Sequence, residues 1–315
     1  MGHCLFGVAD CRRLLKYVYP TDDCCPGQTP SMIREAYHSL VHAVRRSATG
    51  LTAAHPAIEP AVYRLRDCCA RLFVGITRLR TRLRHAAPTT PYRLYRVDPA
   101  SITNSISWQE LTPDRGAAIP DPLTLPNYHF AGGVLDGDWD VDRHPFAESV
   151  IYRSFRAHFE AGVPWPETDL YAQCLDTIDA GGSPWGCTTP AAVDRRCREI
   201  DRLYDRVDRE GYRTQAELLA SGCDEPLDHA RSNRYARTVD GEIALVVGRD
   251  GELLFYDGRN RLAVAKLLGL ESVPVVILVR HRQWQTVRDR VATGETALAD
   301  LPDRLESHPD LVDLR

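Results

Sequence analysis

The chain has 315 residues, which is enough for one large domain or two ordinary ones. Its 43% hydrophobic and 26% charged residues are ordinary for a globular protein. No apolar run reaches the roughly 18 residues of a membrane-spanning helix, so we expect no transmembrane segment. The net charge of −4 is unevenly spread, because residues 1–90 carry +7 and residues 91–315 carry −11. This asymmetry predicts two separate units.

The ten cysteines show no spacing that is typical of a zinc site, so we expect no metal centre. The first residues lack the charged and then apolar order of a signal peptide. We therefore expect a cytoplasmic protein with reduced thiols.

Residues 1–90 are predicted to be a basic helical region. One helix is expected over 31–46 and a second over 61–85. The second helix carries an apolar stripe and many arginines, and the members of the stripe are Val62, Leu65, Cys69, Leu72, Ile76, Leu79 and Leu83. We favour a helical hairpin with a solvated arginine face. The alternative is a surface for nucleic acid or for an anionic membrane.

Residues 91–293 are predicted to form the core, which begins with an alternating strand at 92–97. A long helical insertion is expected at about 103–240, because a connection of this length needs structure of its own. Its helices are predicted at 148–160, 167–180 and 190–210, and a capping box at Thr214 and Glu217 opens one more.

Three aspartates, Asp136, Asp138 and Asp140, alternate around Trp139 in the first part of this insertion. Their carboxylates could hold Mg²⁺ or a substrate amine. The alternative is a tight turn in which the aspartates bond their own backbone and the tryptophan anchors the loop.

The core is expected to resume with a hairpin over 242–256, followed by an Asp257-Gly258 turn and a helix from Arg259. An apolar strand at 273–279 and a helix at 284–290 follow, and residues 294–315 form an acidic tail without an assigned role. His281 is a candidate acid or base, with a plain surface histidine as the favoured alternative.

The start of the helix after the turn is a candidate phosphate site. Free N–H groups and the positive end of the helix dipole point out of it. Fork-shaped guanidinium donors also suit phosphate oxygens. The predicted binding residues are Gly258, Arg259, Asn260 and Arg261. A strand-turn-helix corner that binds nothing is the alternative.

The order Gly258-x-x-Arg261, then Lys266-Leu-x-Gly269-Leu270, then Val273-Pro274-Val275 resembles the core box of the ParB/sulfiredoxin superfamily over about 242–280. The resemblance implies an α+β fold, with a small mixed sheet, in which the turn holds nucleotide phosphates. The nucleotide is CTP in the chromosome-partitioning proteins, ATP in sulfiredoxin, and ADP or ATP in the free-serine kinases.

The sequence departs from this family at three positions, and one of them is Val264, which replaces the usual alanine on the helix. Arg259 stands where sulfiredoxins carry a catalytic cysteine, so repair of sulfinic acids is not expected. Asn260 stands where the sulfiredoxin and kinase branches carry histidine, which weakens assignment to the kinase branch.

Three functions remain open. The first is a nucleotide-binding protein, of which a phosphotransferase that uses ATP or ADP with Mg²⁺ is one form. There Asp257 would bind the metal or orient a small-molecule acceptor, and Asp138 or Asp140 would accept its proton. The second is a DNA-associated, nucleotide-gated clamp that grips nucleic acid through residues 1–90. The third is a scaffold with an inactive pocket.

Overall fold

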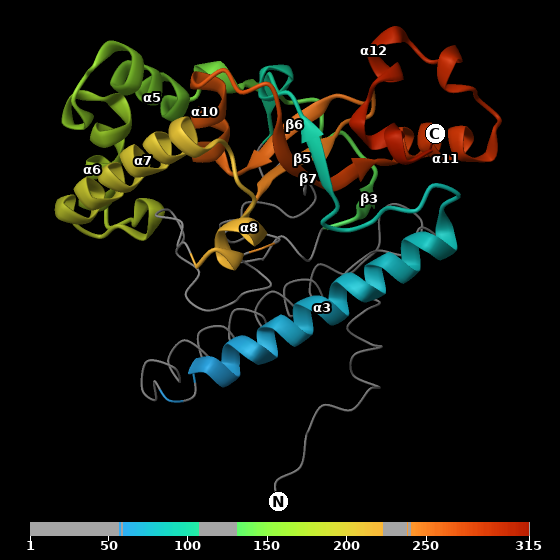
Figure 1. The fold of residues 1–315 in the computed structure, drawn as a ribbon, viewed down its shortest axis with the longest axis horizontal. Coiled ribbons are helices and arrows are strands. Elements are labelled where there is room, and N and C mark those ends of the chain that lie inside the picture. Colours follow the sequence, from blue (N-terminus) through green and yellow to red (C-terminus); the bar gives the residue numbers. More distant parts are fainter. Residues whose placement is uncertain (1–56, 58, 107–130, 223–237, 239–240, 315) are drawn as a thin grey trace, which may run out of the picture. The chain divides into compact units, whose positions relative to one another are not determined.

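The computed structural model describes residues 57, 59–106, 131–222, 238 and 241–314 (Figure 1). The chain divides by its contacts into two compact units, Met1–Tyr63 and Arg64–Arg315, and the fold given below is that of the second unit. The division comes before the boundary that the charge pattern suggested at residue 90. The helix expected over residues 31–46 lies outside the described residues.

The described part of the chain has an α+β fold with eight α-helices and a seven-stranded mixed sheet. The helices are α3 (Glu59–Arg84), α5 (Val150–Ala161), α6 (Asp169–Asp179), α7 (Pro190–Glu210), α8 (Gln215–Ala220), α10 (Arg259–Leu267), α11 (Arg282–Thr293) and α12 (Asp303–Glu306). The strands are β1 (Leu94–Val97), β2 (Asn104–Ser105), β3 (Gly133–Leu135), β4 (His144–Pro145), β5 (Ile243–Val247), β6 (Leu253–Asp257) and β7 (Val273–His281).

The strand β7 lies inside the sheet, whose order is β1-β7-β5-β6-β2-β4. All nine of its residues are buried. The apolar run 273–279 predicted burial of the first seven, whereas Arg280 and His281 were expected beyond the strand. It pairs antiparallel with β1 near its start and parallel with β3 near its end, while β5 runs parallel along its other side. Three of the sheet's strands, β2, β3 and β4, come from the first part of the predicted insertion, where no strand was expected.

The hairpin β5–β6 adds the next two strands. Ala244 pairs with Asp257 at one end of it, and Val247 pairs with Leu253 at the other. The turn that joins the strands therefore lies at one end of the hairpin, and the Asp257-Gly258 corner lies at the opposite end. This separation of the two ends decides which residues can share a site.

The helix α10 packs against α5 and α7, which also pack on their neighbour α6 (Figure 1). The core between the helices and the sheet contains Phe155, Ile200, Ile243 and Leu262, each with an exposed fraction of zero. The helices α5, α6 and α7 begin where the sequence predicted them to within about two residues. The predicted helical subdomain is thus docked directly on the helix that carries the candidate phosphate site.

The C-terminal segment is part of the core rather than an acidic tail. Asp310 is fully buried and accepts a hydrogen bond from Arg280 Nε at 2.8 Å and another from Trp284 Nε1 at 2.9 Å. Burial alone would raise the pKa of Asp310, but the charges of Arg280 and Arg288 bring it below its ordinary value. This carboxylate therefore ties the end of the chain to β7 and α11.

The helix α3 confirms the helix predicted over residues 61–85, but the predicted apolar stripe is not its buried face. Leu65, Leu72, Leu79 and Leu83 are exposed, and their exposed fractions range from 58% to 78%. The buried positions lie on another side of the helix, at Ala70, Thr77 and Thr81.

Candidate functional site

The corner at Gly258 needs a glycine. Gly258 has a φ of 89°, in the left-handed region, and precedes the first residue of α10. A Cβ atom at this position would lie 3.0 Å from Ile243 Cα and 3.3 Å from Glu242 O. The Asp257 carboxylate accepts a hydrogen bond from Gly258 N at 2.7 Å. The predicted turn is therefore present, and Asp257 is exposed beside it.

The three residues after Gly258 diverge. Arg259 is exposed, whereas Asn260 is buried, and Asn260 Oδ1 has no hydrogen-bond partner among the described residues. Arg261 is half-buried and lines a recess at the surface of α7. The four predicted binding residues thus do not form one cradle at the helix end, and Arg261 alone among them faces the recess.

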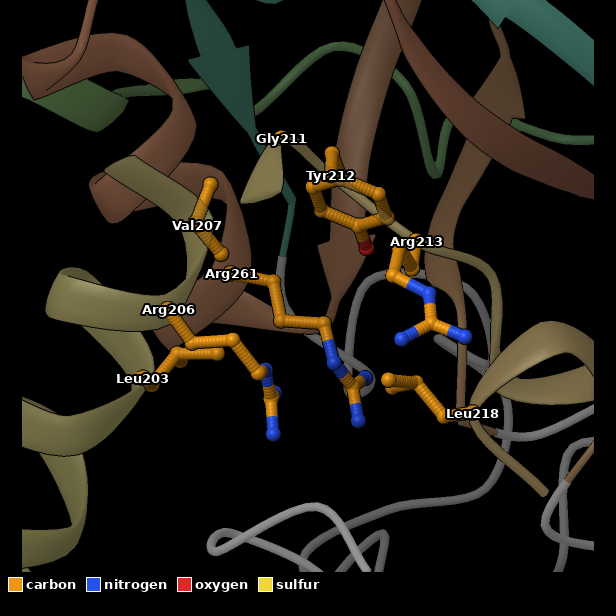
Figure 2. A pocket seen from close by; sticks show the side chains of 8 residues that line it. All are labelled: Leu203, Arg206, Val207, Gly211, Tyr212, Arg213, Leu218 and Arg261. Atoms are coloured by element: carbon orange, nitrogen blue, oxygen red, sulfur yellow. The ribbon is translucent and has the colours of Figure 1, made fainter. Parts of the chain in front are cut away.

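The recess is partly open to solvent and is lined by residues from four segments (Figure 2). They are Leu203, Arg206, Val207, Gly211, Tyr212, Arg213, Leu218 and Arg261. Figure 2 shows the guanidinium groups of Arg206, Arg213 and Arg261 extending toward the same space. The three arginines come from α7, from the segment between α7 and α8, and from α10.

Local sequence signals place two of the recess segments. Gly211, with a φ of 75°, ends α7 and donates its N–H to Val207 O at 3.0 Å. Thr214 then begins α8 through a capping box, in which Glu217 Oε2 accepts from Thr214 N at 2.7 Å. Tyr212 and Arg213 are held between these two signals, so their backbone has little freedom.

Arg213 is oriented by its neighbours. Its Nη2 donates to Ser221 Oγ at 3.0 Å and to Glu217 O at 3.3 Å, and its Nη1 lies 3.6 Å from Glu210 Oε2. These contacts fix the side chain at the edge of the recess.

A fourth arginine interacts electrostatically with Arg261. Arg196, on α7, is buried, and its Nη1 lies 3.2 Å from Glu199 Oε2. Burial lowers the pKa of Arg196, Glu199 opposes that change, and the positive charge of Arg261 lowers it further. Arg196 and Arg261 therefore repel each other, and an anion near them would reduce that repulsion.

The aspartates predicted as catalytic or metal-binding lie elsewhere. Asp140 is fully buried and accepts hydrogen bonds from Arg249 N at 2.6 Å and Arg249 Nη2 at 2.7 Å. Asp138 Oδ1 accepts from the same Nη2 at 2.8 Å. Arg249 belongs to the turn of the β5–β6 hairpin, at the end remote from Gly258. The structure therefore does not bring Asp138 or Asp140 to Asp257, and it uses them to anchor a loop.

The electrostatics of Asp140 agree with an anchoring role. Burial would raise its pKa, but the hydrogen bonds from the side chain and backbone of Arg249 outweigh that effect and lower it. The adjacent Trp139 is buried, with its ring 5.7 Å from the ring of His281. Asp136 is exposed and pairs with Arg282 at 3.2 Å. The buried Trp139 anchors the loop, as the tight-turn alternative expected, and Asp136 Oδ1 accepts from Gly137 N at 3.0 Å. Asp138 and Asp140 differ from that alternative, because they bond Arg249 and not their own backbone.

The favoured expectation for His281, a surface histidine, is wrong, because its exposed fraction is 1%. Its Nδ1 accepts a hydrogen bond from Gln283 N at 3.1 Å and so caps α11. Its Nε2 lies 2.8 Å from Gly137 O, and a carbonyl oxygen only accepts, so Nε2 carries the proton. His281 thus joins the acidic loop to α11 and does not reach the recess.

The described part of the chain has neither a cluster of metal ligands nor a helix that could span a membrane. No group of three or more His, Cys, Asp or Glu side chains there is arranged to hold a metal ion. None of the helices described is both long and apolar enough to cross a membrane.

Arg206 and Arg213 were not predicted as site residues. Arg206 is one of several arginines on the polar side of α7, and nothing in its spacing distinguishes it. Arg213 offers a weak signal, since it lies between a helix-ending glycine and a capping box and so in a short, fixed connection. Comparison of the chain with protein-family models, with curated proteins and with solved structures finds no match.

Proposed function

We propose that the chain binds the phosphate groups of a nucleotide in the recess formed by Arg206, Arg213 and Arg261. The observation that carries the proposal is the convergence of three guanidinium groups from three separate segments on one space. Guanidinium forks match the oxygens of phosphate and bind them with charge-assisted hydrogen bonds. Apolar side chains in the same lining, such as Val207 and Leu218, lower the local dielectric and strengthen these bonds.

The lining of the recess indicates which part of the ligand it takes. Three of its eight residues are arginines, whose guanidinium groups suit phosphate oxygens. We infer that the recess takes the phosphates and that the nucleoside lies outside it. This division predicts weak selectivity among bases and strong dependence on the number of phosphates.

The resemblance of residues 242–280 to the ParB/sulfiredoxin superfamily supports a nucleotide as the ligand, with ATP, ADP or CTP and Mg²⁺ as the first choices. Of the three acidic residues predicted to be catalytic, Asp257 alone lies at the Gly258 corner. A phosphotransferase built on this site would therefore use Asp257 to bind Mg²⁺ or to orient an acceptor, with positioning as the main source of catalysis.

Calorimetric titration of ATP, ADP, CTP and GTP with Mg²⁺ tests the proposal. Loss of one charge-assisted contact of about 1.5–3 kcal/mol should weaken binding by roughly tenfold to a hundredfold in Arg261→Ala and in Arg206→Ala. Arg259→Ala is the matched control, because Arg259 lies on the same helix but is exposed and outside the recess. Equal binding by wild type and Arg261→Ala, or no binding of any nucleotide, would refute the proposal.

The phosphotransferase form has a separate readout. Formation of ADP from ATP should disappear in Asp257→Asn, while that variant should still bind the nucleotide in the absence of Mg²⁺, because the three arginines are unchanged. Binding without any transfer in wild type would leave a nucleotide-binding protein and remove the enzymatic form.

A further inference from the structure

A second surface, on α3, has a regular pattern that the phosphate recess does not involve. Leu65, Leu72 and Leu79 are seven residues apart, and Cys69, Ile76 and Leu83 form a second series with the same spacing. Together the two series occupy the a and d positions of successive heptads, with the three leucines at d. We call these six residues the α3 seam.

The α3 seam is open to solvent at its leucines. The exposed fractions are 65% for Leu65, 58% for both Leu72 and Leu79, and 78% for Leu83. Four exposed leucines on one side of one helix are unusual for a surface that faces only water.

Another side of the same helix is held by the protein itself. Thr81 Oγ1 donates to Thr89 O at 3.2 Å, and His85 Nδ1 lies 3.1 Å from Asp289 Oδ2 on α11. Ala87 N also donates to Asp289 Oδ1 at 2.9 Å. The end of α3 is therefore fixed on α11 through a side that is distinct from the seam.

We propose that the α3 seam pairs with the seam of a second copy of this chain as a parallel two-stranded coiled coil. A strict a/d stripe is narrower than the apolar face of a helix that lies on a membrane, so the pattern fits a partner helix better than a lipid surface. Ile76 at an a position between leucines at d is the combination that favours two parallel strands.

The flanking residues permit pairing of identical helices in this direction. In a parallel pair each g position faces the following e position of the other copy. Cys68 would then face Phe73, and Gly75 would face Arg80. Neither pair brings two like charges together, although the helix as a whole is rich in arginine. The arginines at the c positions, such as Arg71 and Arg78, point away from the seam.

Adjacent cysteines supply a sharp test of register and direction. Cys69 lies at an a position, so a parallel pair puts it opposite Cys69 of the other copy, while Cys68 at g lies at the side. Both are exposed and neither is in a disulfide. Mild oxidation of the full chain should give a covalent dimer on a non-reducing gel. Cys69→Ser should abolish that dimer, and Cys68→Ser should leave it. Cross-linking that depends on Cys68 and not on Cys69 would overturn the proposed parallel pairing.

The mass in solution, measured by light scattering during gel filtration, is the second readout. Wild type should have twice the 35.3 kDa of one chain. The double variant Leu72→Glu, Leu79→Glu should have the mass of one chain and an unchanged melting temperature. Arg78→Glu is the control, because Arg78 is exposed on the same helix but outside the seam. A single-chain mass for wild type would contradict the proposal. A fall in the melting temperature of the double variant without a change of its mass would also contradict it, because the chain's own residues would then cover the seam.

Discussion

Each end of the β5–β6 hairpin has an Asp-Gly turn and an arginine, but the arginine is paired with carboxylates at one end and lines a recess at the other. At the turn end, the charge of Arg249 is matched by two carboxylates, those of Asp138 and Asp140. At the other end, Gly258 leads into α10, and Arg261 extends toward Arg206 and Arg213. An arginine beside an Asp-Gly turn therefore does not indicate a ligand by itself.

The surrounding elements account for the difference. Asp140 lies in a loop about a hundred residues before Arg249 in the sequence, and the fold brings the two side chains together. Because the buried Asp140 carboxylate neutralises Arg249, this end of the hairpin has little positive charge with which to bind a ligand. The helices of the insertion bring further arginines to Arg261. Several positive charges in one place repel one another, so they are expected to favour binding of an anion.

The largest expected effect on stability comes from removing the Asp140 carboxylate, which pairs with Arg249 at the turn end of the hairpin. Asp140→Asn removes the buried charge opposite Arg249, and loss of one partner of a buried pair costs about 3–5 kcal/mol. We expect about 3 kcal/mol, because the Arg249 side chain is 25% exposed and water partly compensates it. Urea denaturation measures the change in the free energy of unfolding.

Asp136→Asn is the matched control for that variant. Asp136 and Arg282 form an ion pair whose side chains are 57% and 47% exposed, and such pairs contribute about 0–1 kcal/mol. Equal destabilisation by Asp136→Asn and Asp140→Asn would show that the loop, and not the buried pair, determines the cost.

A smaller effect is expected at the other end. Gly258→Ala combines a φ of 89° with a Cβ that would lie 3.0 Å from a backbone atom of β5, so we expect a loss of about 2 kcal/mol. Gly269→Ala is the control, since its φ of 59° is also positive but its Cβ would meet nothing within 4 Å. If the two variants lost the same stability in urea denaturation, the close approach of Gly258 to β5 would have no energetic weight.

Local signals predicted most of the fold. Thr189 caps α7 by accepting from Ala192 N at 3.3 Å, and the capping box at Thr214 opens α8, both as expected. The short strands β2, β3 and β4 were missed, because two or three residues are too few to show a period. Their pairing depends on partners far along the chain, such as Val279 for Gly133.

The candidate site was predictable only in part. Arg261 was identified from the turn that precedes it, and the structure places it in a recess. Its neighbours Arg206 and Arg213 come from the insertion, and their convergence depends on how α7 packs against α10. The aspartates were misplaced for a related reason. The alternation of aspartates around Trp139 predicts a turn, but it does not show that Asp138 and Asp140 pair with Arg249.

The smallest expected effect is the pH dependence of the stability that Asp140 contributes at the turn end of the hairpin. The pKa of Asp140 in the folded protein is lowered from 3.8, since hydrogen bonds from Arg249 outweigh the rise that burial alone would cause. A group with a lowered folded pKa contributes stability above its unfolded pKa, and this contribution is lost as the pH falls through the folded pKa. The stability difference between wild type and Asp140→Asn should therefore be constant from neutral pH to about pH 5 and shrink below about pH 4. Urea denaturation of both proteins across this range measures it, and a difference that persisted unchanged below pH 3 would mean that the ionised carboxylate is not what anchors the loop.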